Sequence, residues 1–151
     1  MDTTGTPSVF GRSFRVQDGD LPLVGGDFAT VAGRENFLQG LRIMIDTPFA
    51  SDIFNNRYGF DLLTCLSAPQ PPAIVKELIR LNIVRSLSTD DRLRQIKEIA
   101  FDDEARFFEL NPESDPDDHA RSRQLSREWQ AFVVMDTVEE PASLVVSGIG
   151  A

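Results

Sequence analysis

Apolar residues recur at helical spacing in two segments of the first half of the chain, and each segment predicts an amphipathic helix. The first helix is predicted over residues 34–45, and its apolar positions are Phe37, Leu38, Leu41, Met44 and Ile45. Pro48 ends this helix, because proline disfavours helical geometry in the residue before it. A short apolar piece, residues 60–66, follows it.

The second helix is predicted over residues 73–87, directly after a proline-rich break at residues 69–72. Its expected apolar face consists of Ile74, Leu78, Leu81 and Val84, widened by Val75, Ile79 and Leu87. Its expected outer face carries Lys76, Glu77, Arg80 and Arg85. We expect the apolar face to pack against the core of the domain.

The second half of the chain shows the apolar pattern of strands. Residues 96–110 are β-like, with Ile99 and Phe101 on one face. Residues 129–135 are apolar on both faces, so this strand should be central or covered. A turn at residues 139–141 leads to a last strand, 143–147. Helices followed by strands favour an α+β fold, with two to three helices and then a small antiparallel sheet of about three strands with an exposed edge.

Two segments fall outside this pattern. Residues 1–26 are rich in Gly, Asp, Ser and Thr, which is typical of a flexible or partner-ordered arm, and residues 27–151 then form a single domain. Residues 108–127, approximately, form an acidic excursion that turns basic at its end. Asp115 as N-cap and Pro116 at the first helical position would suit a short helix there. A solvated excursion within a hairpin is the interpretation that we prefer.

Composition and charge limit the classes of function that the chain can have. The chain has 151 residues, the usual size of one domain, and a formal net charge of −9, which repels nucleic acid and anionic membrane surfaces. Its single cysteine, Cys65, excludes an intramolecular disulfide. We find no secretory signal in the first residues and no apolar run of transmembrane length. These observations predict a protein that folds in the cytoplasm, without nucleic-acid binding or membrane insertion.

Catalytic and metal-binding chemistry has weak support in the sequence. Cys65 could pair only with His119, the sole histidine, but a buried cysteine and a solvated histidine explain both residues. The many carboxylates give no reason to select a catalytic pair. Asp115, Asp117 and Asp118 are clustered, but they lack the pattern of a calcium loop. We therefore predict no catalytic residues, no metal site and no cofactor.

Several short motifs occur in a particular order along the chain. Residues 33–41 are followed by residues 45–47 and then by a loop that contains Arg57, Tyr58 and Gly59. After residues 73–87 comes the turn Asp90-Asp91-Arg92, and the chain ends with strands at 132–138 and at Leu144, Val145 and Val146. This order over residues 30–147 resembles the baseplate wedge and sheath-initiator family of contractile tails, once labelled gene-25-like lysozyme.

The motifs depart from the family's usual sequence pattern at three places. Residues 50–52 replace a Gly-Glu pair, Asn56 stands where proline is common, and Asp91 stands where the family carries the proline of a Glu-Pro-Arg turn. The family resemblance implies that Asp90 and Arg92 form a structural ion pair. The rigidity that a proline would give this turn is absent.

The resemblance implies a structural function. Members of this family occur in phage baseplates, type VI secretion systems and extracellular contractile injection particles, where six copies per baseplate are expected. They contact wedge proteins, lie near the tube and spike-hub proteins, and offer a strand edge to the first ring of sheath protein. We therefore expect a non-enzymatic baseplate component whose sheath contact is the strand containing Leu144, Val145 and Val146. A peptidoglycan-cleaving glycosidase and an acidic protein-binding adaptor are the alternatives.

Overall fold

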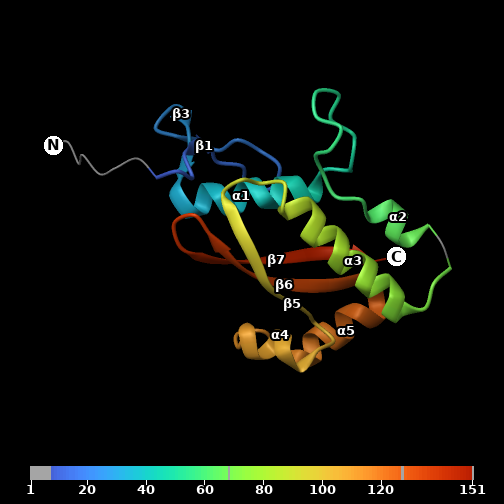
Figure 1. Ribbon diagram of the computed structural model, residues 1–151. Helices are drawn as coiled ribbons and strands as arrows, with labels where there is room; N and C mark the ends of the chain where they lie inside the picture. Colours follow the sequence, from blue (N-terminus) through green and yellow to red (C-terminus); the bar gives the residue numbers. More distant parts are fainter. Residues whose placement is uncertain (1–7, 68, 127, 151) are drawn as a thin grey trace.

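The computed structural model describes residues 8–67, 69–126 and 128–150, and it has an α+β fold, as the sequence predicts (Figure 1). In chain order the elements are β1 (Arg12–Phe14), β2 (Leu23–Val24), β3 (Asp27–Phe28), β4 (Thr30–Ala32), α1 (Gly33–Asp46), α2 (Leu62–Leu66), α3 (Pro72–Leu87), β5 (Leu93–Phe101), α4 (Ala105–Leu110), α5 (Pro116–Ser126), β6 (Glu128–Thr137) and β7 (Pro141–Gly150).

The main sheet has three antiparallel strands in the order β5-β6-β7, so β6 is central and β5 and β7 are its edges. This arrangement confirms the expectation of a small antiparallel sheet of about three strands with an exposed edge. Three helices precede the sheet, but the expectation of two to three helices in all is too low, because the described residues form five helices and two of them lie between β5 and β6. β7 is longer than the predicted 143–147. It continues past a register shift opposite Trp129 and Ala131, beside Gly148, whose φ of 73° is a conformation that favours glycine.

The helices cover the sheet on both sides. α1 and α3 lie on one face, and α4 and α5 lie on the other (Figure 1). The core between the sheet and α1 and α3 is apolar, because alternate residues of β6 point into it, namely Ala131, Val133 and Met135. The opposite face of β6 meets α4, where the rings of Phe107 and Phe132 pack edge to face, 6.3 Å apart.

The N-terminal segment lies against the domain from residue 8 onwards. β1 pairs with β4 and β2 pairs with β3, giving two small antiparallel ribbons beside α1. Phe10 is 1% exposed and stacks on Phe37 of α1, with ring centroids 4.9 Å apart. Phe10, which the sequence placed in an arm, is therefore a core residue. Residues 1–7 of the expected arm lie outside the described residues.

The prediction of a strand over residues 96–110 is wrong in its second half. β5 ends at Phe101, and residues 105–110 form helix α4. The strand ends there because Glu104 turns the chain: its carboxylate Oε2 accepts a hydrogen bond from the Phe101 amide at 3.1 Å, and its amide donates to the Phe101 carbonyl at 2.9 Å. Ile99 and Phe101 do face the core together, as expected.

The preferred interpretation of the acidic excursion is wrong in leaving out a helix, because residues 116–126 form helix α5. Its position is as expected, since the segment connects the antiparallel pair β5 and β6. The alternative that named Asp115 and Pro116 describes its start. Asp115 Oδ1 accepts a hydrogen bond from the Asp117 amide at 2.8 Å, and Pro116 is the first helical residue. Two side chains of this helix, described below, attach it to the end of β5.

The predicted face of the second helix is rotated relative to the observed one. In α3 the buried residues are Ile79, Ile83, Ser86 and Leu87, whereas Leu81 is 64% exposed. Lys76 and Arg80, expected on the outer face, lie over the ring of Phe101 at 5.3 and 5.0 Å. Apolar residues occur all round this helix, so its sequence pattern does not select the buried side.

Candidate interaction site

The turn between α3 and β5 is organised by a two-point ion pair. Arg92 Nε lies 2.9 Å from Asp90 Oδ1, and Arg92 Nη2 lies 2.6 Å from Asp90 Oδ2. The Arg92 amide also donates to Asp90 Oδ1 at 3.0 Å. The Asp90 side chain is 10% exposed and that of Arg92 is 31% exposed. Asp91 is exposed, so the predicted pair forms from the first and third residues of the motif.

Burial and pairing act in opposite directions on the pKa of Asp90. Burial by itself would raise the pKa of this carboxyl, but hydrogen bonds from the Arg92 side chain and amide hold the pKa below its ordinary value. The same contact raises the pKa of Arg92. Both groups are therefore charged around neutral pH, and the turn contains a fixed pair of opposite charges.

Arg92 also connects segments that are far apart in the sequence. Its Nη1 atom lies 3.4 Å from the Phe10 carbonyl, and its guanidinium lies over the ring of Phe37, 5.2 Å from the centroid. Its carbonyl accepts a hydrogen bond from the Val138 amide, at the β6–β7 turn, at 3.0 Å. One side chain thus holds the N-terminal segment and α1 against the turn.

The loop with Arg57, Tyr58 and Gly59 lies beside this turn. Arg57 and Tyr58 line an open hollow of about 630 Å³ together with residues 89–92. Burial raises the pKa of Tyr58, and the nearby charges of Asp90 and Asp52 add to the effect. The structure therefore brings together two motifs that are more than 30 positions apart in the sequence.

Gly59 is required at its position by backbone packing. Its φ is 106°, and a Cβ atom there would lie 2.6 Å from the Thr47 carbonyl oxygen and 2.7 Å from that of Pro48. The Phe60 amide donates to the Thr47 carbonyl at 2.8 Å, and Ser86 Oγ donates to the Gly59 carbonyl at 2.9 Å. The loop is thus held closely against the end of α1 and against α3.

The third motif lies elsewhere, on the edge strand β7. Leu144 and Val146 are buried and Val145 is half-buried, while no strand of the described residues pairs with the outer side of β7. A groove of about 250 Å³ runs beside this edge, lined by Leu144, Val145, Val146 and Ser147 and by Arg42, Ile45 and Asp46 of α1. The edge therefore combines open backbone groups with a wall formed by a helix.

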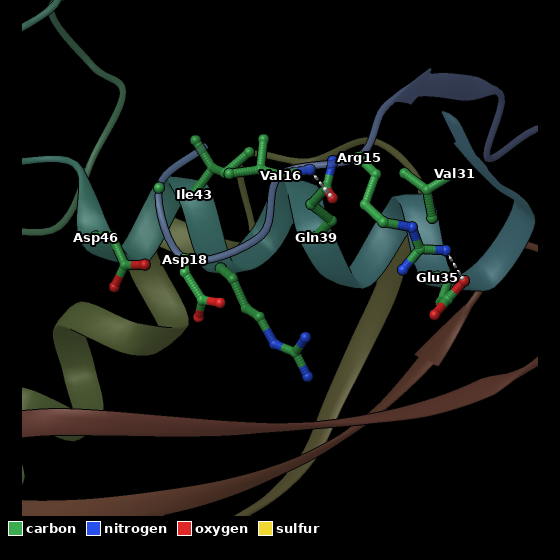
Figure 2. Close-up of a pocket in the computed structure, with 10 residues that line it drawn as sticks. Arg15, Val16, Asp18, Val31, Glu35, Gln39, Ile43 and Asp46 are labelled. Carbon is green, nitrogen blue, oxygen red and sulfur yellow. Dashed lines mark hydrogen bonds and ion pairs between the residues drawn. The ribbon is translucent and has the colours of Figure 1, made fainter. Parts of the chain in front are cut away.

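A second hollow, of about 340 Å³, adjoins the other side of α1 (Figure 2). Figure 2 shows the N-terminal segment crossing the helix, with Arg15 directed at Glu35, where the ion-pair distance is 3.1 Å. The Val16 amide donates to Gln39 Oε1 at 2.9 Å. Arg42 and Asp46 line both this hollow and the β7 groove, so one stretch of α1 separates the two.

Sequence reasoning missed a charged cluster on the opposite face of the sheet. Asp102, at the end of β5, is 1% exposed. Its Oδ2 atom lies 3.2 Å from His119 Nδ1 and 3.3 Å from Arg123 Nη1, both on α5. Its Oδ1 atom has no hydrogen-bond partner among the described residues. Helical spacing of His119 and Arg123, four residues apart, was the only signal available.

The residues considered for catalysis are not brought together. Cys65 on α2 is buried, and Asn82 Nδ2 lies 2.9 Å from its Sγ atom, whereas His119 packs against the rings of Phe107 and Phe108 on the other face of the sheet. Within the described segments, no cluster of three His, Cys, Asp or Glu side chains is arranged to hold a metal ion. No helix of residues 8–67, 69–126 and 128–150 has the length and apolar character needed to cross a membrane.

Comparison with known proteins adds no relative to this picture. No protein-family model, curated protein or solved structure matches the chain.

Proposed function

We propose that this chain is a structural, non-enzymatic baseplate component of a contractile tail or injection machine, which joins the baseplate wedge to the first sheath ring by strand addition on β7. Its partners on this proposal are the sheath protein and wedge proteins, with tube or spike-hub proteins nearby. The sequence resemblance over residues 30–147 supports the class of machine. The open edge of β7 is the observation that supports the mechanism.

β7 is suited to accept a further strand. It has ten residues and pairs with β6 alone, so one of its two rows of backbone donors and acceptors has no ladder partner in the described chain. An added strand would complete these groups and place alternate side chains beside Ile45 in the groove. Backbone hydrogen bonds then supply most of the contact, and side chains adjust its specificity.

The Asp90–Arg92 turn has a supporting role in the same proposal. Arg92 lies over Phe37 of α1, and α1 forms the helical wall of the groove through Arg42 and Ile45. Loss of Arg92 would loosen the contact of α1 with the turn. The effect of this residue on sheath attachment is therefore indirect, through the position of α1.

Proline substitutions in β7 test strand addition. Successive residues of an antiparallel strand direct their amides to opposite sides, so one of Val145 and Val146 has its N–H on the free edge. We expect Val145→Pro and Val146→Pro to differ: one disrupts the β6–β7 ladder, and the other folds but does not nucleate sheath. Ser147→Ala is the control, because it changes a groove side chain and keeps the backbone donor.

Circular dichroism identifies the proline variant that folds, and electron microscopy of baseplates assembled with it measures sheath length. Baseplates with the Ser147→Ala control should carry full-length sheath. The proposed mechanism is wrong if a folded proline variant, at whichever of the two positions has the outward amide, also supports full-length sheath.

A further inference from the structure

We infer that the strand accepted by β7 runs antiparallel to it and carries a basic side chain followed, two residues later, by an acidic one. The basic side chain faces Asp46 and the acidic one faces Arg42. This inference rests on the proposed function, because it specifies the partner of the same edge. It comes from the geometry and the charges of the wall that α1 forms beside the groove.

The spacing of the two charges on α1 matches the spacing of side chains on a strand. Arg42 and Asp46 are four residues apart, which is about 6 Å along a helix axis. Side chains on one face of a strand repeat every two residues, about 6.8 Å. Both residues line the groove that faces residues 144–147, with the half-buried Ile45 beside them. An added strand can therefore meet both charges with two side chains of one face.

Both charges are free to bind a partner. Neither Arg42 nor Asp46 makes an ion pair or a side-chain hydrogen bond with the described residues, whereas the neighbouring Arg15 and Arg92 are paired with Glu35 and Asp90. Arg42 and Asp46 are also exposed. The groove thus presents one unmatched positive and one unmatched negative charge at a fixed separation.

The direction of the added strand sets the order of its charges. The existing sheet is antiparallel throughout, and continuing it makes the new strand antiparallel to β7. α1 and β7 run in the same direction in Figure 1, so a strand antiparallel to β7 passes Asp46 before Arg42. Its basic side chain must therefore come first in its sequence.

The chain itself does not contain this pattern. None of its 15 lysine and arginine residues is followed two positions later by aspartate or glutamate. A second copy therefore cannot supply the matching strand, and the net charge of −9 opposes self-association further. The occupant is an extended segment of a different protein. The charge order selects this segment over copies of the chain, whose open edges would otherwise be free to pair.

Two synthetic peptides test the inference on the full chain. Both peptides have nine residues and a fluorescein label. Threonine occupies the odd positions, and valine occupies positions two and eight. One carries lysine then glutamate at positions four and six, and the other carries glutamate then lysine. We expect the lysine-first peptide to bind about tenfold tighter, as measured by fluorescence anisotropy. Its two charges attract Asp46 and Arg42, whereas those of the other peptide are repelled by them. The preference should shrink at high salt.

A charge-reversed protein gives the decisive comparison. The double variant Arg42→Glu/Asp46→Lys should invert the preference, while Arg34→Glu, an exposed change on the first turn of α1 outside the groove, should leave it unchanged. Equal binding of the two peptides to the unaltered chain, or a preference that survives the double variant, overturns the inference and leaves strand addition intact. If neither peptide binds at millimolar concentration, strand addition on β7 is overturned, and the inferred charge order of the added strand with it.

Discussion

Gly59 offers the most direct quantitative test of the packing beside the candidate site. In Gly59→Ala the new Cβ would lie 2.6 Å from one backbone oxygen and 2.7 Å from another, at a φ of 106°. The unfavourable backbone conformation costs about 1 to 3 kcal/mol. Relieving the overlap also disturbs two hydrogen bonds, from Phe60 to Thr47 and from Ser86 to Gly59, each contributing about 1 kcal/mol. We expect a loss of about 4 kcal/mol in the free energy of unfolding.

The assay is urea unfolding followed by the fluorescence of Trp129, the only tryptophan. Gly25→Ala is the matched control, because Gly25 has a φ of 63° but, its two chain neighbours apart, no residue has an atom within 4 Å of its ideal Cβ position. The control should lose only about 1 kcal/mol, the cost of the left-handed conformation alone. Equal losses in the two variants would show that the contacts of Gly59 with Thr47 and Pro48 do not constrain the loop.

Three further predictions concern the charged groups. Arg92→Ala should lower the free energy of unfolding by about 2 kcal/mol in urea, and a loss no larger than that of an exposed arginine would contradict the contacts of Arg92. Because pairing lowers the pKa of Asp90, the charged carboxylate contributes to the free energy of unfolding fully above its ordinary pKa of 3.8, and this contribution is lost as the pH falls through the lowered pKa. Asp90→Asn should therefore reduce the fall in Tm at acid pH. Replacing residues 111–122 by a short Gly-Ser linker removes His119 and should lower Tm by about 5 °C. Adding Asp102→Asn should recover part of that loss, whereas an unchanged Tm would fit a solvated excursion.

The sequence pattern predicted elements wherever one face of the chain is apolar and the other polar, or where a strand is apolar throughout. β6 was placed within a few residues, because its apolar character on both faces requires cover from both sides. α1 was placed within one residue at each end, with Phe37 and Leu41 buried as expected. The motif residues Tyr58 and Arg92 line one hollow in the structure, and nothing in their spacing along the sequence predicted this.

The remaining features depend on contacts between segments distant in sequence. α3 is apolar all round, so only the position of the sheet decides that Ile83 is buried and Leu81 is exposed. α5 has no buried residue in the described chain, and a polar segment of this composition resembles a loop until the buried carboxylate of Asp102 is known. His119 therefore appeared solvated in the sequence, yet it helps to attach a helix to the sheet.

α1 links the two parts of the candidate site. On its inner side, Phe37 packs against the guanidinium of Arg92 and against the ring of Phe10 in the N-terminal segment. Its C-terminal half supplies Arg42 and Asp46 to the groove. A helix moves as a rigid rod over distances of this size, so a change at the turn reaches the groove without any direct contact between them. On the proposed function, this connection would let a motif far from β7 affect strand addition. It also separates two effects: loss of Arg92 should weaken binding of both peptides alike, because it shifts the wall, whereas reversal of both charges, at Arg42 and Asp46, should change only which peptide is preferred.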